Sequence, residues 1–152
     1  MNKTLRIYQQ LEKFPLGKRL FSWQVGRVAP YFSSVSPLVT QLEKNYCSIL
    51  IKRQRKVFNH IKTMHVIAIC NGLEMAMGVM AEASIPKNLR WIPKGMTVNY
   101  TAKAASDIRC IAKVNESDWK VGDMIVPVKA IDENDIEVVV GEIKLWITER
   151  KS

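Results

Sequence analysis

The sequence predicts an α+β domain in which a curved antiparallel β-sheet surrounds one long buried helix. Residues 64–81 are nearly all apolar and contain no proline, which is typical of a helix that is buried on most of its surface. Further along the chain, apolar residues recur at every second position in four stretches, which indicates half-buried strands. The 152 residues fit a single domain, with a helical elaboration over 1–34 and a core over 36–150.

Two short helices are expected before the core. Leu5, Tyr8 and Leu11 have helical spacing, and residues 18–28 form a second amphipathic segment that carries basic side chains. A basic amphipathic segment can lie on a membrane surface. We favour packing of both helices on the domain or on a sister subunit, and we expect no stable membrane insertion.

The segment that follows the loop 30–37 reads as one long strand over 38–51. Next comes the densest basic run of the chain, at 52–56. Such runs are commonly solvated surface, but this one lies shortly before the central helix. A role in phosphate binding is therefore an equally reasonable interpretation.

Glu74 is the unusual residue of the central helix, because it lies among Leu73, Met75 and Met77. An ionised carboxylate is costly to bury without partners. We therefore expect Glu74 to reach a rim, to be paired, or to serve chemistry. Polar interruptions and limited length argue against a membrane span here, and Pro86 ends the helix.

Four antiparallel strands should follow the helix, over 96–102, 108–114, 124–130 and 136–147. Residues 132–135 predict a turn, and Gly141 a bulge in the last strand. A sheet of this kind would cover the helix on one side only. The other side then needs another layer or another subunit, so we expect a homo-oligomer.

Composition narrows the functional classes. The net charge of +9 favours an anionic partner, such as a nucleotide-bearing small molecule, nucleic acid or an acidic membrane. Three scattered cysteines and an N-terminus without a continuous apolar run lead us to expect a reduced, cytoplasmic protein. No sequence motif of serine hydrolases, P-loop NTPases or dinucleotide enzymes occurs, and His60 and His65 lack further ligands at metal-binding spacing, so we expect no metal site.

The order of elements, together with Asn59, His65 and Glu74, resembles the hotdog-fold acyl-CoA thioesterases of the phenylacetic-acid-pathway type, over residues 38–150. In that family an Asn precedes the helix, a His-Gly-Gly begins it, and an acidic residue follows two turns later. The chain departs from the family at Val66 and Ile67, where two glycines are usual. The family polarises the thioester carbonyl with a backbone N–H, which Val66 retains.

The resemblance implies hydrolysis of an acyl-CoA thioester, with coenzyme A as part of the substrate and no other cofactor. Glu74 would be the base or nucleophile, Val66 the oxyanion donor, and Asn59 an assistant. His65 lies nine residues before Glu74 and should face the opposite side of the helix. In the family the active site lies between two subunits of a dimer or tetramer, which fits this opposed facing. From the residues alone, a buried structural role for His65 is the stronger interpretation.

Substrate contacts are expected from the basic run and from the helix. Arg53, Arg55 and Lys56 would meet the phosphates of coenzyme A. Asn71 lies three residues before Glu74 on the same face, where it would hold the carboxylate or line the subunit interface.

Two other functions remain open at this stage. A non-catalytic acyl-CoA or fatty-acyl binding protein would keep the fold but lose the oxyanion site, because Val66 replaces a glycine. A basic nucleic-acid-binding module has the required charge, but the strands carry no alternating aromatic residues and no recognisable motif. We therefore expect no nucleic-acid partner.

Overall fold

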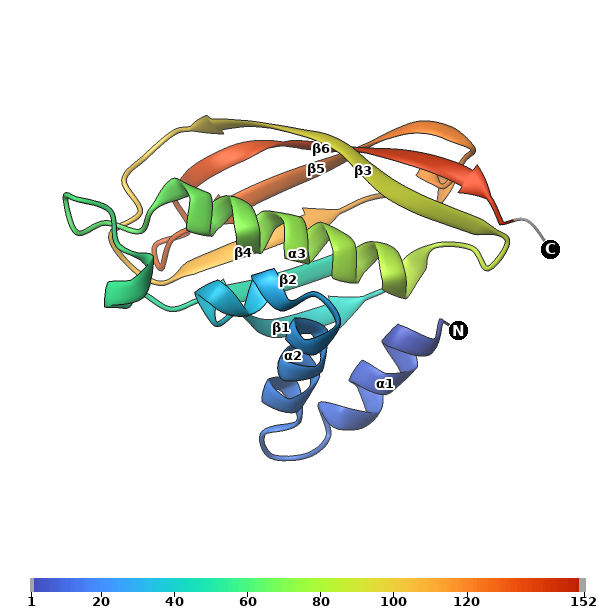
Figure 1. The fold of residues 1–152 in the computed structure, drawn as a ribbon, viewed down its shortest axis with the longest axis horizontal. Coiled ribbons are helices and arrows are strands. Elements are labelled where there is room, and N and C mark those ends of the chain that lie inside the picture. The colour runs from blue at the N-terminus through green and yellow to red at the C-terminus, as the bar shows by residue number, and fades with distance from the viewer. Residues whose placement is uncertain (1, 151–152) are drawn as a thin grey trace.

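A computed structural model, which describes residues 2–150, confirms the α+β architecture. One six-stranded antiparallel sheet curves around a long helix, and two shorter helices lie against one edge of this core (Figure 1). The helices are α1 (Lys3–Leu11), α2 (Gly17–Val28) and α3 (Val66–Ser84), with 3-10 turns η1 (Pro30–Val35), η2 (Arg55–Val57) and η3 (Glu116–Asp118). The strands are β1 (Leu38–Glu43), β2 (Tyr46–Ile51), β3 (Leu89–Tyr100), β4 (Ile108–Lys113), β5 (Gly122–Ile131) and β6 (Glu137–Glu149), in the sheet order β1-β2-β4-β5-β6-β3.

The prediction of one strand over 38–51 was wrong, because the chain reverses in the middle of this segment. Asn45 has φ 66°, a left-handed conformation that Asn tolerates better than most residues, and β1 pairs with β2 as a tight antiparallel hairpin. The sheet therefore has one strand more than the sequence predicted.

Helix α3 is covered on its sheet side and open on the other. Its inner residues pack against β2 and β4, and Leu73, Met77 and Met80 are fully buried. On the opposite face Ile67 is 55% exposed and Glu74 is exposed. By length and composition α3 would be long enough to cross a membrane, but it is mostly buried as the core helix of this domain.

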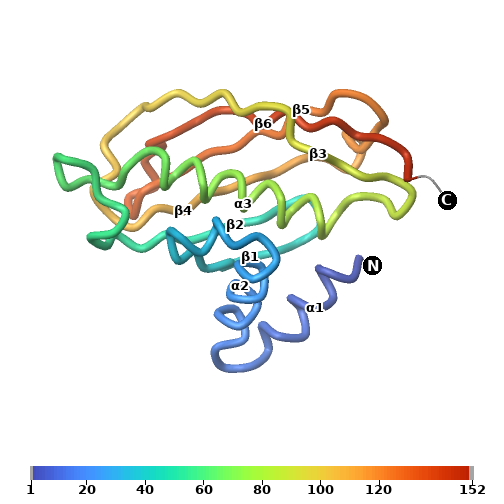
Figure 2. Tube along the Cα trace, in the orientation of Figure 1, coloured from blue at the N-terminus to red at the C-terminus, as the bar shows by residue number. Residues whose placement is uncertain are grey.

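The two edges of the sheet differ. At the β1 edge, the backbone N–H of Val39 donates to Ser22 Oγ (2.8 Å), and the carbonyl oxygen of Thr40 accepts from Tyr8 Oη (3.0 Å) and Lys18 Nζ (2.6 Å). The helices α1 and α2 thus cover this edge, as predicted for packing on the domain (Figure 2). Burial raises the pKa of the Tyr8 hydroxyl well above its usual value, so it remains a donor.

The other edge strand, β3, pairs with β6 and has no strand on its outer side among residues 2–150. It begins earlier than the sequence predicted and is not half-buried: Leu89 is its one fully buried residue, and Tyr100 is 64% exposed. Pro93 is tolerated because an edge position requires no N–H donor on one side. A long open edge is a site for pairing with another chain.

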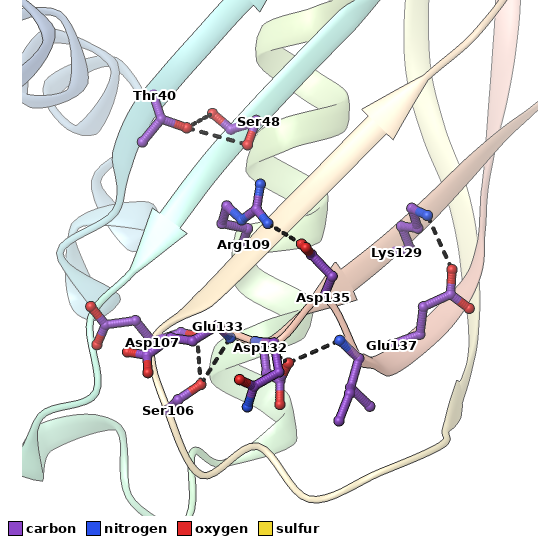
Figure 3. Close-up of polar contacts among 12 residues, drawn as sticks. Thr40, Ser48, Ser106, Asp107, Arg109, Lys129, Asp132, Glu133, Asp135 and Glu137 are labelled. Atoms are coloured by element: carbon purple, nitrogen blue, oxygen red, sulfur yellow. Dashed lines mark hydrogen bonds and ion pairs between the residues drawn. The ribbon is translucent and has the colours of Figure 1, made fainter.

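The β5–β6 hairpin has the predicted turn but not the predicted bulge. Asp132 Oδ1 accepts from the N–H groups of Asn134 and Ile136, and ion pairs Arg109–Asp135 and Lys129–Glu137 flank the turn (Figure 3). Gly141 pairs in regular register, whereas the extra residue of β6 is Val138, next to the turn. Gly141 is instead required by the close approach of β3.

We predict that Gly141→Ala destabilises the fold by about 3 kcal/mol. A Cβ at this position would lie 2.1 Å from the carbonyl oxygen of Thr97 and 2.8 Å from the Cα of Val98, and backbone atoms cannot move aside cheaply. Gly95→Ala on β3 is the matched control, because a Cβ there meets nothing within 4 Å. Urea unfolding of both variants measures the difference, and equal midpoints would contradict the prediction.

Candidate active site

The first half of the candidate site is the loop that precedes α3. Asn59 Oδ1 accepts from the N–H groups of Ile61 (3.1 Å) and Thr63 (3.0 Å), and its Nδ2 donates to Thr63 Oγ1 (2.7 Å). The amide of Asn59 therefore holds the loop 59–63 in shape. One N–H of its Nδ2 group has no acceptor among the described residues.

The start of α3 leaves a backbone donor free. His65 is the N-cap, and its Nδ1 accepts from the N–H of Ile67 (3.1 Å). His65 is exposed, so the prediction of a buried structural histidine was wrong. Val66 is the first helical residue, and its N–H has no acceptor among residues 2–150. A free N–H at a helix N-terminus suits a developing negative charge.

These residues line one cavity of about 270 Å³. Three of the expected site residues, Asn59, His65 and Val66, lie together there. The cavity also contains Tyr100 and Lys103, at and just beyond the end of β3, which the sequence analysis did not propose. The alternating pattern of that segment identifies a strand, but it cannot indicate that the strand ends beside the start of α3.

Glu74 belongs to a different hollow. It lies on the open face of α3 and borders an apolar groove of about 430 Å³ between α3 and the N-terminal helices. Glu74 is exposed in the single chain and forms no ion pair within residues 2–150. Glu74 therefore lies at the rim of the groove, which was one of the three expected outcomes for this carboxylate. Because it is exposed to solvent, its charge costs little desolvation free energy in one chain.

A single chain does not unite the two halves of the site. Val66 and Glu74 are eight residues apart, so they are separated by about 12 Å along the helix axis at about 1.5 Å per residue. A thioester carbonyl at the N–H of Val66 is beyond reach of the carboxylate of the same chain.

Asn71 connects α3 to the N-terminal segment. It is 8% exposed, and its Nδ2 donates to the carbonyl oxygen of Tyr31 (3.3 Å) and to Ser34 Oγ (3.2 Å). No hydrogen bond joins it to Glu74. Its Oδ1 is buried beneath η1 and accepts no hydrogen bond from residues 2–150.

The basic run lies beside the first half of the site. Arg53 donates to the carbonyl oxygen of Lys62 (3.0 Å), at the tip of the loop 59–63, and its guanidinium stacks over the ring of Phe58. Lys56 donates to Ser36 Oγ (2.6 Å). Arg55 is exposed and forms no side-chain hydrogen bond among the described residues.

The three cysteines are free thiols, and burial raises the pKa of each. Cys47 and Cys110 are fully buried, whereas Cys70 is partly exposed. Within residues 2–150 no cluster of His, Cys, Asp or Glu could hold a metal ion.

Known structures have the same architecture. A crystal structure named genomics APC5556 is 38% identical, with a TM-score of 0.85 over 97% of this chain and 99% of that one. The protein PA5026 of Pseudomonas aeruginosa, described as a probable thioesterase, is 18% identical, with a TM-score of 0.77 over 90% and 97% of the chains. Thioesterase HI1161 of Haemophilus influenzae is 8% identical, with a TM-score of 0.71 over 82% and 88%.

These likenesses confirm the predicted hotdog fold, in which a curved antiparallel sheet surrounds a central helix. No curated protein matches the chain. The family model described as Domain of unknown function (DUF4442) matches residues 17–147, which is most of the domain. The chain belongs to this family.

Proposed function

We propose that this chain is a cytoplasmic acyl-CoA thioesterase whose active site is shared between two subunits. One observation carries the proposal: within residues 2–150, the N–H of Val66 at the start of α3 has no acceptor and the carboxylate of Glu74 has no partner, and the two groups lie in separate hollows. Each group would be one half of a thioester-hydrolysing site, so a complete site would need two chains.

A two-fold axis would join the halves. If the α3 helices of two copies lie antiparallel, Val66 of each chain faces Glu74 of the other, and the interface is isologous. The unpaired edge of β3 and the exposed Ile67 are surfaces that such a dimer would cover. Two copies of a dimer could associate further into a tetramer.

The chemistry needs three groups around the thioester carbonyl. The N–H of Val66 would stabilise the oxyanion. Glu74 of the partner subunit would take a proton from the attacking water, or would attack the carbonyl itself. His65 and Asn59 lie in the same cavity as Val66, where His65 would protonate the leaving thiolate and the free N–H of Asn59 would orient water or carbonyl. Hydrolysis yields the free acid and coenzyme A.

Coenzyme A would bind along the basic run. Arg53, Arg55 and Lys56 lie next to the loop 59–63, and Lys103 lines the same cavity. Their charges suit the phosphates of coenzyme A. Asn71 would act indirectly, by holding η1 against α3, because its side chain is buried. The acyl group itself supplies no charge, so these cations would act mainly on affinity.

A non-catalytic acyl-CoA binding protein of the same fold is the second candidate. It is favoured by Val66 and Ile67, whose side chains occupy positions where thioesterases of the resembled type have glycine. Release of free thiol from a panel of acyl-CoAs separates the two functions: a binder retains affinity without turnover.

Two single variants test the catalytic groups. Glu74→Gln should lower turnover by about 10²–10⁴-fold because the base is lost. Val66→Pro should lower it by about 10²–10³-fold because the oxyanion donor is lost. Proline is well tolerated at the first helical position, and His65 already has the extended ψ of 132° that a following proline requires.

Val66→Ala is the matched control, since it shortens the side chain and keeps the N–H. Melting temperatures near that of the wild type would show that the fold is intact. If Glu74→Gln or Val66→Pro turns over within threefold of the wild-type rate, the substituted residue has no catalytic role.

Mixed dimers test the sharing of the site. A hybrid of Glu74→Gln and Val66→Pro chains has one site with both groups intact and one with neither. After unfolding and refolding of an equal mixture, half of the dimers are hybrids, so activity should return to about one quarter of the wild-type value. A mixture as inactive as its parents would indicate sites within single chains.

Cys70 tests the antiparallel arrangement without an assay of activity. Pairing of position 66 with position 74 places position 70 on the two-fold axis, and packed helix axes are about 8–10 Å apart. A bis-maleimide of about that length should therefore join two chains through Cys70, since Cys47 and Cys110 are buried. Cys70→Ser should abolish the covalent dimer; its persistence would contradict the arrangement.

A further inference from the structure

We propose that the groove between α3 and the N-terminal helices binds the straight alkyl chain of a medium-length acyl thioester. The inference rests on the proposed function and adds the acyl specificity of the site. It assigns a role to α1 and α2, which lie outside the sheet-and-helix core.

The lining of the groove is suited to an alkyl chain. Twelve of its fourteen lining residues are uncharged, and the two exceptions are Glu74, at the reacting end, and Glu82. The walls come from three parts of the chain. Ile7 belongs to α1, Val25 to α2, and Trp91 to β3, while Met77 and Gly78 form the floor on α3. A volume of about 430 Å³ lies within the range of small-molecule sites.

Gly78 gives a second, independent indication. Glycine within a helix is destabilising relative to alanine, so it needs a reason. Gly72 has one, because a Cβ there would lie 2.6 Å from Ile51 Cδ1 and 2.7 Å from Cys110 Sγ. At Gly78 a Cβ would meet only the Trp91 ring, at 3.5 Å, which is ordinary contact. Packing within the chain does not demand this glycine; the space it leaves opens into the groove, one helical turn from Glu74.

The length of the groove indicates how long an alkyl chain it can hold. It follows α3 from Glu74 to Glu82, eight residues or about 12 Å. An extended alkyl chain advances about 1.25 Å per carbon, given C–C bonds of about 1.5 Å. The groove therefore accommodates about ten carbons. At its far end the carboxylate of Glu82 accepts from Trp91 Nε1 (2.9 Å), which fixes the indole across the floor.

Charge favours the thioester over the product. A thioester carbonyl is neutral, whereas the free fatty acid would place its carboxylate beside Glu74, and like charges repel. The groove should hold an acyl-CoA more tightly than the acid of equal length. Repulsion between the two carboxylates would therefore favour dissociation of the product, and no conformational change would be needed for its release.

The test uses straight-chain acyl-CoAs from acetyl to hexadecanoyl. For the wild-type protein, kcat/KM should rise by about fourfold per methylene, the ratio expected for burying one CH₂, and level off near ten carbons. Gly78→Leu should level off about four carbons earlier, so its loss of kcat/KM relative to the wild type should grow with each carbon beyond that length. Helix propensity favours Leu over Gly, so the melting temperature should hold or rise. Gln10→Leu, on α1 outside the groove, is the matched control.

A binding measurement separates this inference from the proposed function. Decanoyl-CoA should bind Glu74→Gln more tightly than acetyl-CoA does, and Gly78→Leu added to that variant should reduce the difference to that expected for a chain about four carbons shorter. If the chain-length profile of Gly78→Leu matches the wild type, the groove is not the acyl site, whatever the protein hydrolyses. If Gly78→Leu changes only the oligomeric state, the groove belongs to a second copy and the inference is overturned. Gly78-dependent binding without hydrolysis would refute the thioesterase and retain the acyl site.

Discussion

The structure depends on one constraint: a single curved sheet cannot enclose an apolar helix. Strands β2 and β4 bury the inner face of α3. The two edge strands, β1 and β3, do not meet over its outer face. The chain covers part of that face with α1 and with η1, and Asn71 ties η1 to the helix. The rest, around Ile67 and Glu74, stays open. Both the groove and the proposed dimer contact are consequences of this incomplete cover.

The sequence predicted what regular periodicity encodes. Helix α3, the two N-terminal helices, β4 and β5 all lie where apolar spacing placed them, and the turn at Asp132 lies where its turn-forming residues placed it. The hairpin at Asn45 was missed because residues 38–51 contain neither glycine nor proline, and a single left-handed residue is enough to reverse the chain. The bulge was assigned to Gly141 because glycine often marks bulges, although here the close passage of β3 explains the glycine.

The sequence indicates which candidate residues are neighbours, but not how the rest of the site is arranged. Asn59, His65 and Val66 line one cavity because all three belong to the loop and the helix start that follows it. Tyr100 and Lys103 join them through the position of β3 at the sheet edge, which depends on long-range pairing with β6. The exposure of Glu74 also follows from tertiary structure, because its sequence neighbours are buried on either side of it.

A thioesterase site needs both an oxyanion donor and space for the acyl group. A glycine at the helix start would supply both, whereas Val66 offers the N–H without the space. An oxyanion donor needs only an N–H at the first helical position, and Val66 would supply it whatever its side chain is. The acyl group needs space, which the proposed groove offers elsewhere on the same helix, at Gly78, one turn from Glu74. If two copies are antiparallel, the open glycine of one chain lies next to the free N–H of the other. The side chain of Val66 would then narrow the shared site on one side, and the acyl chain would extend into the groove on the other side.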